Sequence, residues 1–171
     1  MPDPAQLVVG FDLDMTLIDT RPGFAATLSV LAEETGTVLD VEDLSNRLGP
    51  PLDLMLAPHY PAEDLPGLVA RFRAHYPAHA IAPTGTFPGA HAALDAVRRH
   101  GGRSVVVTGK YRPNAALHLE ALDLDADALV GEVWGSARAR CWSSTARAST
   151  SVTTSMTSRV PARPGRSACR C

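Results

Sequence analysis

The chain of 171 residues is 45% hydrophobic and carries a formal net charge of −2, which suits one globular domain with room for a modest insertion. This balance gives no electrostatic reason to expect nucleic acid or a membrane surface as a partner, and no apolar run approaches the length of a membrane span. The first residues lack the basic start and the long apolar run of a signal peptide, so we expect a cytoplasmic location.

The first half of the chain predicts one strand followed by a long helical region. Residues 7–11 form a short apolar run with β-branched side chains, which is typical of a buried strand. From residue 21 to about residue 80, apolar residues recur at helical spacing, and prolines divide the stretch into short helices. Residues 83–86, Pro-Thr-Gly-Thr, indicate a linker.

The second half predicts helices and strands in alternation. Residues 89–100 have a helical apolar face, with basic residues in the last turn and glycine after it. Residues 104–108 and 128–130 are expected strands, and a helix beginning at Pro113 is expected between them. Strands alternating with helices imply an α/β fold with a parallel sheet, in which ligands bind at the carboxyl ends of the strands.

These elements predict a core interrupted by an insertion. We expect an α/β core from residues 1–20 and 85–135, and an inserted helical cap from residues 21–84, because that interval is too long for a simple crossover. All 18 acidic residues precede residue 136, whereas residues 136–171 hold seven arginines and no Leu, Ile or Phe. This basic tail has little to bury, so we expect it to be disordered, with no strand packed beside the first one.

The pattern Asp12-x-Asp14-x-Thr16 follows the first predicted strand directly. A polar turn at a strand end would explain such a pattern if it stood alone. Two carboxylates facing one crevice, however, repel each other and need a cation or a proton to coexist. One carboxylate can then attack phosphorus while the other transfers protons.

The surrounding residues make a resemblance specific. Residues 9–20, Val-Gly-Phe-Asp-Leu-Asp-Met-Thr-Leu-Ile-Asp-Thr, resemble the first motif of haloacid dehalogenase-like phosphatases of the phosphoglycolate phosphatase-like branch. Residues 87–90, the helix that follows them and residues 105–110 resemble the region of the second motif. The likeness implies a Rossmann-like core with a helical cap, and a Mg²⁺-dependent phosphatase for a small phosphorylated metabolite.

The resemblance also implies roles for matching residues. Asp12 is the expected nucleophile that forms an aspartyl-phosphate, and Asp14 the expected acid and base. The Asp12 carboxylate and the Asp14 carbonyl are the expected Mg²⁺ ligands. Thr108 and the Gly109 N–H are expected to bind phosphate, and Thr16 belongs to the same substrate-binding set.

Two basic residues are weaker candidates for contact with the substrate. Lys110 is the only lysine of the chain, but this branch often has a non-catalytic lysine there, and the catalytic one follows the third strand. Arg47 resembles a cap segment near the substrate, although a solvated arginine at a helix end is the simpler interpretation.

Beyond Gly135 the family pattern stops, because neither the third-motif lysine nor the acidic fourth motif appears. Codons can be chosen so that one added base restores a lysine in place of Arg138. The same frame gives Gly-Asp-His-Val-His-Asp in place of residues 152–157. We therefore interpret residues 136–171 as a frameshift product that leaves the core incomplete, the alternative being a natural basic tail.

Other functions remain open at this level. A phosphomutase would share the same nucleophile, and a non-catalytic fragment could retain the phosphate pocket. A receiver-like phosphoacceptor domain also uses Asp, Thr and Lys on a parallel sheet, but it has neither the second carboxylate nor a long insertion.

Overall fold

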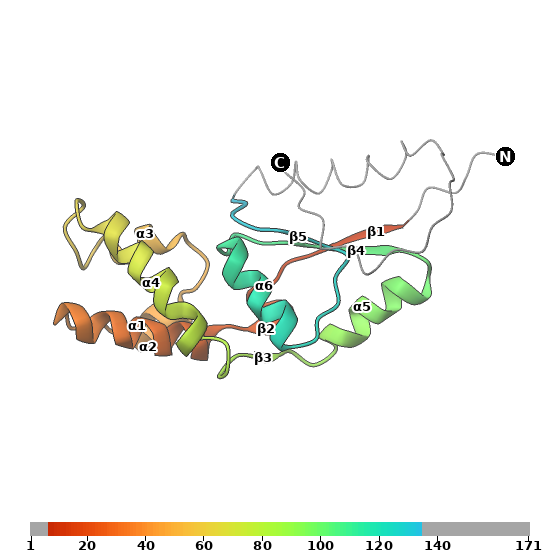
Figure 1. Ribbon diagram of the computed structural model, residues 1–171, viewed down its shortest axis with the longest axis horizontal. Helices are drawn as coiled ribbons and strands as arrows, with labels where there is room; N and C mark the ends of the chain where they lie inside the picture. The colour runs from red at the N-terminus through yellow and green to blue at the C-terminus, as the bar shows by residue number, and fades with distance from the viewer. Residues whose placement is uncertain (1–6, 135–171) are drawn as a thin grey trace, which may run out of the picture. The chain divides into compact units, whose positions relative to one another are not determined.

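The computed structural model describes residues 7–134 (Figure 1). The chain divides into two compact units, one formed by Met1–Leu17 with Pro88–Cys171 and the other by Ile18–Phe87. The predicted boundaries of core and cap lie a few residues from these divisions, and that domain assignment stays a prediction. The expectations for residues 136–171 lie outside the described residues.

The first unit contains a parallel sheet with the strand order β1-β4-β5. Its strands are β1 (Val8–Phe11), β4 (Arg103–Val107) and β5 (Ala128–Val130), and β4 pairs parallel with both neighbours. Gly10 aligns with Val105, and Val105 with Ala128. The prediction of an α/β fold with a parallel sheet is therefore confirmed.

Two helices complete the described part of this unit, α5 (Ala90–Arg99) and α6 (Arg112–Ala121). After α5 the chain turns at Gly101, whose φ of 68° lies in the left-handed region that glycine enters without strain. Pro113 lies in the first turn of α6, where its missing N–H has no helical partner to lose. These signals mark the chain reversals directly before and directly after β4.

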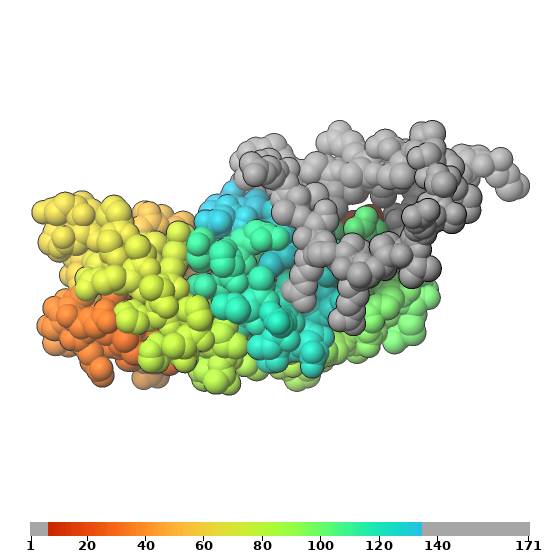
Figure 2. Space-filling model, in the orientation of Figure 1, coloured from red at the N-terminus to blue at the C-terminus, as the bar shows by residue number. Residues whose placement is uncertain are grey.

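The second unit is helical, with α1 (Arg21–Thr35), α2 (Val41–Asn46), α3 (Leu52–Leu56) and α4 (Leu65–His79). The atoms of this unit are coloured orange to yellow-green in Figure 2. Its core is built from aliphatic and aromatic side chains, among them Leu28, Leu31, Leu56, Leu68 and Phe72. Phe72 lies 5.3 Å from Phe24 and 5.7 Å from Tyr76, ring centre to ring centre.

The structure differs from the sequence prediction at residues 83–86. Instead of a plain linker, Gly85–Thr86 form the short strand β3, which pairs antiparallel with β2 (Ile18–Asp19). The pairing joins the two points where the chain enters and leaves the helical unit. A ladder of two residues is too short to produce an alternating hydrophobic pattern, so the sequence did not reveal it.

The β1 strand has one paired edge within residues 7–134, the edge toward β4. Val8, Val9 and Phe11 are only half-buried and Gly10 is exposed, whereas Val106 and Val107 of β4 are completely buried. Among the described helices, none is long and apolar enough to cross a membrane.

Candidate active site

The candidate site is formed by two loops that follow neighbouring parallel strands. Asp12 and Asp14 come directly after β1, and Thr108, Gly109 and Lys110 come directly after β4. Because β1 and β4 are adjacent and parallel, their carboxyl ends lie at the same edge of the sheet. This arrangement brings residues almost a hundred positions apart in sequence to one place.

Asp14 is the centre of the observed contacts. The Lys110 Nζ donates to the Asp14 Oδ1 at 2.8 Å, and the Thr108 Oγ1 donates a longer hydrogen bond of 3.4 Å to the Asp14 Oδ2. The Lys110 side chain is 12% exposed and the Asp14 side chain 29%. The Lys110 N–H also donates to the Thr108 Oγ1 at 3.1 Å, which ties the second loop together.

A tight turn anchored by Leu13 positions the two carboxylates. The Leu13 side chain is completely buried, and its carbonyl accepts from the N–H groups of Thr16 at 3.2 Å and Leu17 at 2.9 Å. Met15 has a φ of 59°, which allows the chain to reverse within this turn. The Asp12 Oδ1 accepts from the Leu13 N–H at 2.7 Å, so the Asp12 carboxylate is held at the strand end.

The remaining predicted residues lie in different surroundings. Thr16 lies in the turn after β1, with an exposed side chain. Gly109 follows Thr108 on the second loop, as expected. Arg47 belongs to the helical unit, where it ends α2 and forms an exposed ion pair with Asp43. The structure thus brings together Asp14, Thr108 and Lys110, with Asp12 on the same strand end as Asp14.

Sequence analysis missed His118, which is completely buried on α6. The pKa of His118 is lowered from 6.5 to about 4, chiefly by burial and in addition by the Lys110 ammonium, while the Asp14 carboxylate acts in the opposite direction. The available signal was the spacing of Ala115, His118 and Leu119, which places the histidine on the apolar face of the helix.

Trp134 was also missed. Its indole packs so closely on Gly109 that a Cβ added to the glycine would lie 2.7 Å from ring atoms. No local pattern identifies this contact, because it joins the loop after β4 to the segment after β5.

The oxygen donors of the first loop suit a hard cation. Within residues 7–134, no group of three or more His, Cys, Asp or Glu side chains is arranged to hold a metal ion. Mg²⁺ needs only one or two protein carboxylates, because water and substrate phosphate complete its octahedral shell. The Asp12 carboxylate and the Asp14 carbonyl therefore fit the expected ion, although they form a minimal donor set.

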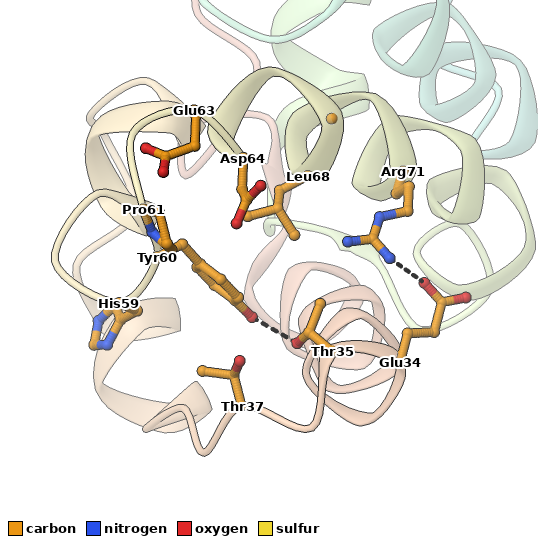
Figure 3. A pocket seen from close by; sticks show the side chains of 11 residues that line it. Glu34, Thr35, Thr37, His59, Tyr60, Pro61, Glu63, Asp64, Leu68 and Arg71 are labelled. Atoms are coloured by element: carbon orange, nitrogen blue, oxygen red, sulfur yellow. Dashed lines mark hydrogen bonds and ion pairs between the residues drawn. The ribbon is translucent and has the colours of Figure 1, made fainter.

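A separate hollow of about 580 Å³ lies within the helical unit. Its lining includes Glu34, Tyr60 and Arg71 (Figure 3), with Tyr60 hydrogen-bonded to Thr35 at 2.9 Å. None of the residues predicted for phosphate chemistry lines this hollow.

Known proteins resemble this chain in sequence and in fold. Residues 9–130 match the sequence profile of a family described as haloacid dehalogenase-like hydrolases. A phosphoglycolate phosphatase from Rhodospirillum rubrum is 34% identical over 137 residues, an alignment that covers 73% of this chain and 56% of that protein. The chain spans about half the length of the curated relatives it matches.

Solved structures share the fold. A haloacid dehalogenase-like family hydrolase from Streptococcus pneumoniae aligns with a TM-score of 0.71 and 20% identity, covering 84% of this chain and 71% of that one. A predicted phosphatase from Clostridium acetobutylicum aligns with a TM-score of 0.64 and 26% identity, covering 74% of this chain and 61% of that one.

Proposed function

This chain belongs to the haloacid dehalogenase-like hydrolases, and from that membership we propose that it is a Mg²⁺-dependent phosphomonoesterase for a small phosphorylated metabolite. The observation that carries the proposal is the meeting of Asp14, Thr108 and Lys110 at the strand end that also bears Asp12. The similarity to phosphoglycolate phosphatases supports the same reaction class.

In the proposed reaction Asp12 attacks the substrate phosphorus, and the bond to the leaving oxygen breaks. Asp14 protonates that oxygen, and it later removes a proton from the water that hydrolyses the aspartyl-phosphate. The Asp12 carboxylate and the Asp14 carbonyl would hold Mg²⁺, which would reduce the repulsion between the nucleophile and the phosphate.

Thr108, Gly109 and Lys110 bind the phosphate oxygens in this proposal. The Lys110 ammonium now rests on Asp14 at 2.8 Å, so an incoming phosphate dianion would compete with that carboxylate for it. Binding of phosphate thereby releases the Asp14 carboxylate, which takes up from solvent the proton that it then donates to the leaving oxygen. Thr16 and Arg47 are proposed as further substrate contacts on weaker grounds. Thr16 is exposed in the turn after β1, and Arg47 is already paired with Asp43.

The test is release of inorganic phosphate from p-nitrophenyl phosphate and from a panel of phosphorylated metabolites, with and without Mg²⁺. We expect Mg²⁺-dependent hydrolysis that Asp12→Asn reduces to background and Asp14→Asn reduces by at least about 100-fold. Asp53→Asn, which neutralises an exposed carboxylate on α3, is the matched control and should leave turnover unchanged.

A second function, phosphate binding without turnover, is favoured by one observation. Glu132 is the last acidic residue of the sequence, so the acidic fourth motif of the family does not appear after it. Saturable binding of phosphate with no hydrolysis of any ester would support this alternative. Absence of both binding and hydrolysis would reject both functions.

A further inference from the structure

Residues 131–134 cross the loop that follows β4 and are bonded to it through the backbone. The Glu132 N–H donates to the Lys110 carbonyl at 3.0 Å, and the Val133 N–H donates to the Thr108 carbonyl at 3.1 Å. The Thr108 N–H in turn donates to the Val130 carbonyl at 2.9 Å. The phosphate-binding loop of the proposed site is therefore fixed along one side by the chain that leaves β5.

Two backbone features show that this crossing is tightly constrained. A Cβ added to Gly131 would lie 2.6 Å from the Arg112 Cβ and 2.9 Å from the Lys110 carbonyl oxygen, so only glycine fits there. Glu132 has a φ of 61°, in the left-handed region that is unfavourable for a residue with a side chain. The hydrogen bonds of Glu132 and Val133 offset this strain and set the position of the next residue.

That next residue, Trp134, lies with its indole against Gly109. A Cβ on Gly109 would meet the Trp134 Cη2 and Cζ2 at 2.7 Å and the Cζ3 at 2.8 Å. The indole is still 42% exposed, so it is a large apolar group held at the surface beside a polar loop. Burial of apolar area alone does not account for a tryptophan in this position.

We propose that Trp134 is a positioning residue of the phosphate site, holding Gly109 so that its N–H and the neighbouring Lys110 face the bound phosphate. This inference rests on the proposed function, because it assigns the phosphate to the loop of residues 108–110. The Trp134 indole acts on the phosphate through the backbone of residues 108–110. Because the indole touches this loop directly, its fluorescence reports the conformation of the loop.

Fluorescence tests the contact without requiring turnover. The sequence contains two tryptophans, Trp134 and Trp142, so Trp142→Phe leaves Trp134 as the only indole. Titration of this variant with inorganic phosphate in the presence of Mg²⁺ should change its emission in a saturable way. The matched control, Trp134→Phe with Trp142 retained, should show no saturable change.

Equilibrium dialysis with radiolabelled phosphate, run on the same proteins, separates the possible failures. Phosphate that binds in dialysis while the Trp134 emission stays constant would overturn the role of Trp134 and leave the proposed function intact. Absence of phosphate binding in dialysis would overturn both. The inference is supported if the phosphate concentration at half-saturation is the same in the emission titration and in dialysis.

A double-mutant cycle tests the positioning role itself. Trp134→Ala should weaken phosphate binding by about 2–10-fold, the value of one aromatic contact, and Trp134→Phe should restore most of the affinity. Gly109→Ala should weaken binding because its Cβ collides with the indole, and the double variant with Trp134→Ala should recover affinity relative to Gly109→Ala alone. Equal losses in Gly109→Ala and in the double variant would show that the indole does not set the loop.

Discussion

Charge balance around Asp14 favours the proposed cation at this site. Asp12 and Asp14 bring two carboxylates to one strand end, and Lys110 brings the ammonium that contacts Asp14. A phosphate dianion entering the site adds two further negative charges that the single ammonium does not balance. A divalent cation held by the Asp12 carboxylate and the Asp14 carbonyl would supply the missing positive charge.

His118 makes the stability of the α/β unit depend on pH. Burial and the Lys110 ammonium lower its pKa to about 4, against 6.5 for an unperturbed histidine. As the pH falls below 6.5, the unfolded chain takes up a proton that the folded chain does not. The folded state therefore loses stability between pH 6.5 and about 4, and this loss levels off below the folded pKa.

We expect His118→Leu to reduce that pH dependence. At about 1.4 kcal/mol per pKa unit, the histidine accounts for a fall of up to roughly 3 kcal/mol in the free energy of unfolding across the window. Urea denaturation of the variant and of the parent chain at pH 7.5 and pH 5 measures the difference. His59→Gln, which alters an exposed histidine, is the control, and a pH dependence unchanged by His118→Leu would contradict the assignment.

At the scale of elements, Gly23 sets how closely the end of α4 approaches α1. A Cβ on Gly23 would lie 2.7 Å from the Thr84 Oγ1 and 2.9 Å from the Ala80 Cα. The surrounding polar groups are already paired: the Thr84 Oγ1 donates to the Ala80 carbonyl at 2.8 Å, and the Thr27 Oγ1 donates to the Gly23 carbonyl at 2.9 Å. A side chain here would displace backbone and not merely the end of a flexible side chain.

We therefore expect Gly23→Ala to destabilise the helical unit by about 1–3 kcal/mol, as overpacking does, although alanine favours a helix by about 1 kcal/mol over glycine. Gly67 of α4 is the matched control, because a Cβ there meets no atom within 4 Å. Gly67→Ala should be neutral or stabilising in the same denaturation experiment. Equal effects of the two substitutions would show that the α1–α4 approach tolerates a methyl group.

The strands and helices of the α/β unit could be predicted because each has a strong local signal. The β-branched run of residues 104–108 and the glycine after α5 depend only on neighbouring residues. The β2–β3 pair could not be predicted, because it joins residues far apart in sequence through a ladder too short to give a local pattern. The close approach of Gly23 to the backbone of Ala80 likewise has no signature in the sequence.

The candidate site was predictable to the extent that its residues follow strands directly. Asp12, Asp14 and Thr108 each end a predicted strand, and the family resemblance assigned all three to one phosphate site; the structure places β1 beside β4. The contact of Trp134 with Gly109 depends on the tertiary crossing of residues 131–134. A single tertiary contact produces no periodic pattern in the sequence, so only the structure could reveal it.

At the scale of the whole molecule, the sheet of the described residues has the three strands β1, β4 and β5. Within that part of the chain β1 pairs only with β4, and Val8, Val9 and Phe11 keep part of their surface exposed. An apolar strand with an open edge favours association with other chains. The relatives that the chain matches are about twice as long as the matched part, so they have further chain with which to complete a fold.

One base added ahead of the codon for Arg138 would restore the reading frame in which the family's lysine and acidic motif appear. The present residues 136–171 contain few large apolar side chains, namely Trp142, Val152, Met156 and Val160. Fixing the backbone of each residue costs about 1–2 kcal/mol, and so few apolar groups offset little of that cost. The restored frame can supply the lysine, the acidic motif and, in place of residues 161–170, the run Arg-Ala-Ala-Gly-Pro-Leu-Gly-Val-Pro-Val. We expect this variant to show a larger soluble fraction after centrifugation and faster Mg²⁺-dependent release of phosphate than the present chain. A chain ending at Gly135 is the control for simple removal of the basic tail, since it should gain solubility at most. If the restored frame were neither more soluble nor more active than the present chain, residues 136–171 would have to be regarded as the natural continuation of this protein.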